Sequence, residues 1–382
     1  MTSNRKRRTA IVSAALVAAA GVVCASGGGL ADDLTPALSS PLHHDAFAAA
    51  AGLAPAKAAK DRRPNLWRIV FANDVFFGSD NQFTNGFTVE IHSPFFDNLD
   101  DVRGGPAWGK RIARGVLPQR EGLRYRKGFV VGQNMQTPTD ITNPNIILDD
   151  VPYLGMLAVA SSWIALDDMH FTGFELLFGL VGEDSGAEEV QKAIHALIDS
   201  DDPQGWEFQL DTEPVVQFIW MKKRKLWNLD HFDGAVTADV KAGNFIAGAE
   251  GGLEMRFGTR LPTGFVYIPD VFGSNINYAA DVLDEIGRFS VVGSVTLRAK
   301  AVGYSMARDG NVLVDGNEWT DNNTIEPANY IGQAILGLTL ARPRWALRFS
   351  LWFTTDTIDP ASIGRKEDPE SNFGVISFEW RR

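Results

Sequence analysis

From Asn65 onward the chain consists of short segments in which apolar and polar residues alternate, separated by Gly, Asp, Asn and Pro. An alternation of period two places apolar side chains on one face of a strand and polar side chains on the other. In the last segment, Ile376 and Phe378 share one face, and Ser377 and Glu379 share the other. We count twelve such segments, near residues 66–74, 84–92, 127–136, 153–166, 170–181, 209–222, 230–242, 246–259, 289–304, 330–342, 344–356 and 372–380.

This pattern predicts an all-β protein, an antiparallel transmembrane β-barrel of about twelve strands. An even strand number is the rule for bacterial single-chain barrels, in which apolar residues face lipid and polar residues face the lumen. Aromatic residues near the segment ends would form the interfacial girdles: Trp67, Trp163, Trp220, Trp345 and Trp380. The alternative is a soluble β-sandwich or lipocalin-like barrel with a packed aromatic core. The last segment favours the membrane barrel because it ends on an aromatic residue, although two arginines follow it.

The N-terminal part of the chain differs in composition and lacks the alternating pattern. A basic stretch, an apolar run from Ala10 to Ala25 and small residues ending at Ala31 predict a signal peptide over residues 1–31. Residues 32–64 are rich in Ala and Pro and read as a flexible linker. The barrel domain would then span residues 65–382, in the outer membrane of a Gram-negative bacterium.

Composition excludes several classes of function. The formal net charge of −11 argues against nucleic acid as a partner. The single cysteine, Cys24, lies in the signal peptide, so the mature chain has no disulfide, metal thiolate or catalytic thiol. The chain contains no G-x-S-x-G elbow, no H-E-x-x-H motif and no phosphate-binding glycine loop. No segment after the signal peptide has the apolar run of about 18 residues that a transmembrane helix requires.

One segment breaks the strand pattern. Residues Ala187–Ile198, between the fifth and sixth predicted strands, read as an amphipathic helix with Ser185 as N-cap and Glu188 completing a capping box. Its apolar stripe consists of Val190, Ile194 and Leu197. Gln191 and His195 are four positions apart and therefore lie on one face of the helix. Long ordered connections of a barrel are where function tends to reside.

Oxygen-bearing side chains gather around the first predicted hairpin. Asn73 and Asp74 end the first strand, and Asp80, Thr84 and Asn85 lie in the hairpin loop and at the start of the second strand. Asp, Asn and Gly are ordinary turn residues, so a purely structural role is one interpretation. The other is a site for a hard cation such as Ca²⁺, which prefers carboxylate, carbonyl and hydroxyl oxygens.

His195 differs in context from the other five histidines, which lie in the linker or near strand ends. It is placed on the helix and is followed by the acidic residues Asp199, Asp201 and Asp202. A neutral imidazole can take a proton from water, and an acidic neighbour can orient the ring. A single histidine on a helix can equally be structural, and its position alone does not decide between the two roles.

An ordered set of motifs resembles one protein family. The set comprises Asn73-Asp74, Thr84-Asn85-Gly86, Thr137-Pro138, Pro152-Tyr153 with Gly155, Gln191 with His195, and Gly205-Trp206 through Gln209 to Glu213-Pro214. No single motif is specific, but their order and spacing resemble the LpxR family of lipid A 3′-O-deacylases, over roughly residues 65–382.

The resemblance implies a twelve-stranded outer-membrane barrel that removes the 3′-linked acyloxyacyl chain of lipid A and requires calcium. It implies that His195 is the general base that activates water and that Gln191 belongs to the same cluster. The metal and oxyanion side of the site would be built by Asn73, Asp74 and Thr84. The family also has a carboxylate a few residues after the histidine, for which Asp201 is our choice over Asp199 and Asp202.

One family feature is missing. The lysine of the third-strand region has no obvious counterpart near Gln133-Asn134-Met135, which leaves contacts to substrate phosphates unassigned. Two other functions stay open on the sequence alone. One is a catalytically idle barrel that acts as a channel, adhesin or structural protein, and the other is a serine-type barrel phospholipase. The joint presence of Asn73, Asp74, Thr84 and His195 favours the deacylase.

Overall fold

The computed structural model describes residues 66–74, 82–103, 107–269, 275–276, 278, 281–282, 289–364 and 369–381. The predicted signal peptide, 1–31, and linker, 32–64, lie outside these residues. No helix in the described part is long and apolar enough to cross a membrane.

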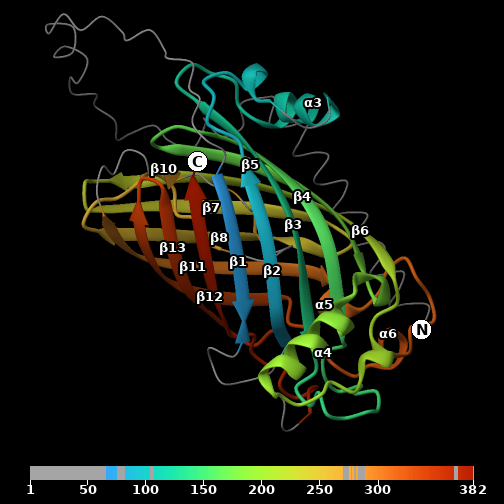
Figure 1. Ribbon diagram of the computed structural model, residues 1–382. Coiled ribbons are helices and arrows are strands. Elements are labelled where there is room, and N and C mark those ends of the chain that lie inside the picture. The colour runs from blue at the N-terminus through green and yellow to red at the C-terminus, as the bar shows by residue number, and fades with distance from the viewer. Residues whose placement is uncertain are drawn as a thin grey trace, which may run out of the picture.

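Twelve antiparallel strands close into one barrel, as the alternating segments predicted (Figure 1). The strands are β1 (Leu66–Asn73), β2 (Gln82–His92), β3 (Arg124–Thr137), β4 (Leu154–Leu166), β5 (His170–Val181), β6 (Glu213–Asn228), β7 (Phe232–Gly243), β8 (Ile246–Gly258), β11 (Ser290–Ser305), β12 (Tyr330–Arg342), β13 (Trp345–Thr354) and β14 (Phe373–Arg381). Strand β1 pairs with β2 on one side and with β14 on the other, which closes the ring. A separate two-stranded ribbon consists of β9 (Thr263–Gly264) and β10 (Asp281–Val282).

The two faces of the wall carry opposite side chains. On β14, Phe378 is 45% exposed on the outer face, whereas Ser377 and Glu379 are fully buried on the lumen side. Phe71, Phe87 and many other large apolar residues are exposed in the same way on the other strands. Since an apolar exterior around a charged interior suits lipid outside and polar groups inside, the wall is that of a membrane barrel rather than a soluble one.

The two ends of the barrel differ in their connections. The turns 167–169, 229–231 and 343–344 are tight and lie at the end that holds the C-terminus. The same end also carries the long connections 93–123 and 259–289. At the other end the turn 244–245 is tight, and the longer connections are 138–153, 182–212, 306–329 and 355–372. Outer-membrane barrels have short periplasmic turns and longer extracellular loops, so the C-terminal end, which has most of the tight turns, is periplasmic. There Trp67 stacks on Trp380 at 6.2 Å between ring centroids, as expected of an interfacial girdle.

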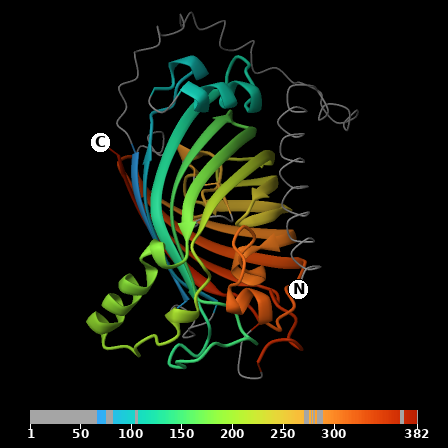
Figure 2. The ribbon, with the colours of Figure 1, turned by 90° about the vertical axis from the view of Figure 1, so that its right-hand side faces the viewer.

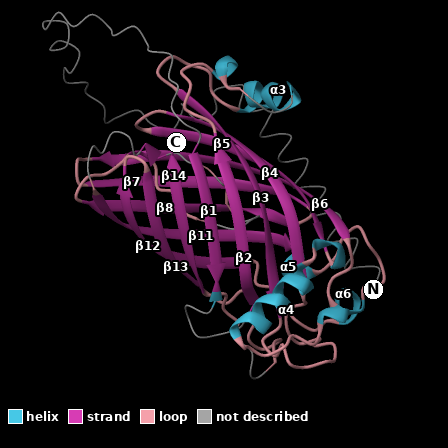
Figure 3. Ribbon diagram, viewed as in Figure 1, coloured by secondary structure: helices cyan, strands magenta, loops and turns pink. Residues whose placement is uncertain are grey.

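Helices cap both ends (Figures 2 and 3). The extracellular end carries α4 (Ala187–Ile198), α5 (Met306–Asp309) and α6 (Glu318–Asn322), with the short 3₁₀ turns η3 (Glu183–Ser185) and η4 (Trp206–Phe208). The periplasmic end carries η2 (Leu99–Asp101) and α3 (Ala107–Val116), in the connection between β2 and β3. Helix α4 has the bounds that the sequence predicted.

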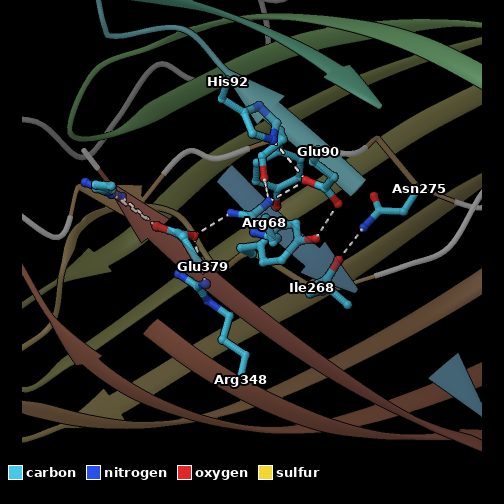
Figure 4. A network of polar contacts seen from close by, with 10 residues as sticks. Arg68, Glu90, His92, Ile268, Asn275, Arg348 and Glu379 are labelled. Carbon is cyan, nitrogen blue, oxygen red and sulfur yellow. Dashed lines mark hydrogen bonds and ion pairs between the residues drawn. The ribbon is translucent and has the colours of Figure 1, made fainter. Parts of the chain in front are cut away.

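Described residues of the connection between β8 and β11 lie in the lumen, where a charged network contacts them (Figure 4). Arg68 on β1 donates to Glu90 and to Glu379, both at 2.8 Å, and to the carbonyl oxygen of Tyr278 at 3.0 Å. The Tyr267 hydroxyl of the same connection donates to Glu90 at 3.1 Å. Because Arg68, Glu90 and Glu379 are fully buried, their charges depend on one another.

This network generates the first prediction. Replacing Arg68 with methionine leaves the buried Glu90 without an arginine partner, whereas Glu379 keeps Arg348 and Arg381. The uncompensated carboxylate should cost about 3–5 kcal/mol of barrel stability. The folded, fast-migrating form on unheated gels should therefore be lost at a lower temperature than in the parent. Arg344→Met, an exposed arginine in the 343–344 turn, is the control. Equal melting of the two variants would show that the lumen network does not stabilise the barrel.

Candidate functional site

Helix α4 packs against the outside of the barrel wall at the extracellular end, and Figure 2 shows it projecting outward. The start of the helix lies close to β4. A Cβ on Gly155 would come within 2.2 Å of the Ala187 side chain. Only glycine at this position allows so close an approach. The Gln133 amide on β3 donates to the carbonyl oxygen of Ser185 at 2.7 Å, which fixes the entry to the helix from the side.

The N-cap prediction was wrong. Gly186, in a left-handed conformation with φ of 67°, caps α4 without any side-chain hydrogen bond, so Ser185 is not the N-cap. Ser185 instead ends the preceding 3₁₀ turn η3. A glycine accommodates this backbone conformation where a serine would be strained.

The packed face of α4 is the polar one. Gln191 and His195 are 2% and 8% exposed, whereas Val190 and Leu197 of the apolar stripe are 39% and 84% exposed. An amphipathic helix on a soluble protein would turn its apolar stripe inward. The reversal indicates that the outer side of α4 meets an apolar medium while its inner side encloses polar groups.

His195 is oriented by the main chain that follows the helix. Its Nδ1 lies 2.6 Å from the carbonyl oxygen of Asp201. A carbonyl oxygen can only accept, so Nδ1 carries the hydrogen and Nε2 of the neutral ring holds a free lone pair. Asp199, with φ of 56°, ends the helix and turns the chain back toward the ring. Asp201 thus lies beside His195, but it contacts the ring through its backbone carbonyl oxygen, and its side chain is exposed.

Gln191 is fixed by Trp206, a residue of the motif set whose contact with the helix the sequence did not predict. The indole Nε1 of Trp206 donates to Gln191 Oε1 at 2.7 Å, and the Trp206 ring packs 4.9 Å from that of Tyr153. Burial raises the pKa of Tyr153 to about 12, and its hydroxyl donates to the Ile141 carbonyl oxygen at 3.2 Å. The buried Nε2 of Gln191 has no hydrogen-bond partner in the described part of the chain and remains an available donor.

The oxygen-bearing residues lie at the ends of β1 and β2. Asn73 is the last residue of β1 and pairs with Asn85 on β2. Asp74 follows directly and is fully buried. Thr84 lies in β2 where the pairing with β3 shifts register between Phe83 and Asn85. The side chain of Thr84 lies outside the described part of the structure, as does the whole of Asp80.

Strand register connects these residues to the helix. Asn73 is opposite Asn85, Asn85 opposite Met135, and Met135 opposite Gly155, so four strands contribute one row. The far end of that row, Gly155, is the glycine that touches Ala187 at the start of α4. Both groups of candidate residues therefore lie at the extracellular end of one continuous stretch of wall, β1 to β4.

The donor set suits a hard cation in its chemistry. Asn73, Asp74 and Thr84 offer an amide, a carboxylate and a hydroxyl oxygen, and none of them offers nitrogen or sulfur as a natural metal ligand. Among the described residues no group of three or more His, Cys, Asp or Glu could hold a metal. A site here would contain a single carboxylate and would bind a divalent cation weakly.

The Trp206 contact generates the second prediction. Gln191→Leu keeps the size of the side chain but leaves the buried indole N–H without its acceptor, at a cost of about 1–3 kcal/mol. Added protease should then cut the 182–212 connection faster in the folded protein. Lys192→Leu changes the neighbouring exposed residue, whose surface ion pair with Glu188 contributes little. If both variants resist cleavage as the parent does, the contact does not order this connection.

Comparisons with known proteins agree with this architecture. The family model described as "Outer membrane protein LpxR" matches residues 46–382. The solved structure of LpxR from Salmonella typhimurium superposes with a TM-score of 0.61 at 13% identity, covering 82% of this chain and 99% of that one. The β domain of the Bordetella autotransporter BrkA is similar with a TM-score of 0.39 at 10% identity, covering 84% and 99%. A search of curated proteins found no significant match. The chain belongs to the LpxR family of outer membrane proteins.

Proposed function

We propose that this barrel is a lipid A deacylase that hydrolyses the 3′-linked acyloxyacyl ester with a water molecule activated by His195. Membership of the LpxR family supports a role in deacylating lipid A in the outer membrane. The observation that carries the mechanism is the geometry of His195. The ring is buried on the inner face of α4, toward the outer side of the wall. The Asp201 carbonyl oxygen fixes its tautomer.

The reaction follows from that tautomer. Nε2 of His195 accepts a proton from water as the water oxygen attacks the ester carbonyl carbon. A tetrahedral oxyanion forms, and its collapse breaks the bond to the sugar oxygen. The imidazolium returns its proton to that oxygen, so that the acyl chain leaves as an acid and the sugar recovers a hydroxyl. The Asp201 carbonyl stabilises the charged ring through the Nδ1 hydrogen bond throughout.

Other groups would stabilise the oxyanion. Gln191 lies one helical turn from His195, and its free Nε2 could donate to a polar group of the substrate. Asn73, Asp74 and Thr84 are the residues that would hold Ca²⁺, which, when bound, supplies positive charge for the developing oxyanion. Gln133 lies in the third-strand region, where the family lysine has no obvious counterpart in this chain. Its amide donates to the carbonyl oxygen of Ser185.

The surroundings of the helix fit an amphiphilic substrate. Val190 and Leu197 are exposed on the outer side of α4, and Phe71, Phe87 and Leu157 are exposed on the wall nearby. A lipid ester must reach the site from the membrane rather than from water. Apolar side chains on both the helix and the wall would contact its acyl chains while the polar residues between them contact the ester region.

His195 generates the third prediction. His195→Ala should lower the rate of lipid A deacylation by the purified enzyme by about 10²–10⁴-fold, because the general base is lost. His231→Ala is the control, since this exposed histidine also bonds a carbonyl through Nδ1 but lies at the periplasmic end. Asp201→Asn should retain activity close to the parent, because the backbone carbonyl is unchanged. Hydrolysis by His195→Ala at the parent rate would make the ring structural.

The fourth prediction concerns calcium. Activity should disappear in a chelator and return with Ca²⁺, with half-saturation on the order of 10⁻⁴–10⁻³ M, as in weak extracellular sites. Mg²⁺ should substitute poorly because it requires tighter octahedral geometry. Asp74→Asn removes the formal charge and should raise the Ca²⁺ needed for half-activity. Undiminished turnover in excess chelator would contradict the metal proposal and return Asn73 and Asp74 to a structural role.

A further inference from the structure

Helix α3 lies at the opposite end of the barrel from the candidate site, outside the wall (Figure 1). It buries the small residues Gly109, Ala113 and Val116, which are spaced along one helical face. Their partners include Tyr125, Trp163 and Phe174 of strands β3 to β5. A Cβ on Gly109 would be 3.5 Å from the Trp163 ring, so the helix lies directly on this aromatic surface.

The opposite face of α3 combines an aromatic residue with basic ones. Trp108 is 48% exposed, Arg111 is exposed one turn further along the helix, and Arg114 is exposed in the last turn. Arg114 pairs with Asp100 at 2.6 Å, but both side chains are more than half exposed. Arg111 has no ion-pair partner among the residues that the structure describes. This combination is typical of a helix that lies in a membrane interface.

Charge sets this connection apart from the rest of the molecule. Residues 93–123 contain five Lys and Arg and four Asp and Glu, a balance of +1 in a chain whose net charge is −11, and helix α3 itself contains three basic residues and no acidic one. A local positive balance on an acidic protein attracts an anionic surface and does not arise from overall composition.

The basic face adjoins the lipid-facing wall. Lys127 on β3 lies with its Nζ 5.4 Å from the Trp163 ring centre. Two residues further along the same outer face, Phe129 is 45% exposed in the apolar belt. The helix is therefore positioned at the boundary between the apolar belt and the periplasmic water, where phospholipid headgroups of the inner leaflet lie.

We propose that α3 is an interfacial helix that binds anionic phospholipid of the periplasmic leaflet. Trp108 enters the headgroup region. Arg111 contacts phosphate groups, and so does the half-buried Lys110, whose Nζ also donates to the carbonyl oxygen of Asp100 at 2.8 Å. The glycine and alanine face against Trp163 holds the helix flat on the wall, so that its cations point toward the lipid. This anchor is independent of the chemistry at α4, because the two helices lie at opposite ends of the barrel.

Native mass spectrometry of the mature protein from detergent micelles tests the proposal. With equal amounts of phosphatidylglycerol and phosphatidylcholine, the protein should retain phosphatidylglycerol preferentially, and added salt should weaken the preference. The double variant Lys110→Gln, Arg111→Gln should bind phosphatidylglycerol about fivefold more weakly for each charge removed. Arg344→Gln, an exposed basic residue at the same end but outside α3, should bind as the parent does.

Three results would overturn the proposal. These are equal retention of the two lipids by the parent, equal binding by the double variant and Arg344→Gln, and displacement of the lipid by inorganic phosphate alone. The last would indicate a free-anion site instead of a lipid surface. Heat modifiability of the double variant on gels confirms that it is folded. Because no lipid A is used, the result is independent of deacylase activity.

Discussion

Closure of the backbone is the constraint on which this structure depends. A strand in lipid must hydrogen-bond on both sides, so β1 has to pair with β14 as well as with β2. Once the ring is closed, alternate side chains are forced into lipid or into the lumen. The apolar outer belt and the buried charges on Arg68, Glu90 and Glu379 are both consequences of that single requirement.

The same constraint places the candidate site. Because the register of β1 to β4 aligns Asn73 with Gly155, residues far apart in sequence reach one level of the wall. The connection after β5 then lays α4 across that level on the lipid side. Gln191 and His195 are covered by the wall, while the apolar stripe of the helix remains outside. A polar site open to lipid thus arises from a rigid wall and one helix.

The periodicity of apolar and polar residues predicted where several strands and helix α4 begin and end. The bounds of β5 and β12 and of α4 agree with the predicted segments, because alternation and helical spacing are local properties. Long-range contacts were missed. The return of the β8–β11 connection to Arg68 and the packing of α3 on Trp163 leave no periodic signal. The sequence predicted that the carboxylate of Asp201 would support His195. In the structure the backbone carbonyl oxygen of Asp201 orients the ring. Every residue type has such a carbonyl, so the sequence gives no signal for this contact.

The most direct measurement of the central claim is the mass of lipid A from cells that produce this protein, compared with cells that lack it. A deacylase predicts the loss of one acyloxyacyl unit, with fragmentation placing the missing chain at the 3′ position. The His195→Ala variant, produced at the same level in the membrane, should leave lipid A intact. Identical lipid A from cells with and without the active protein, under calcium-replete conditions, would contradict the proposed activity.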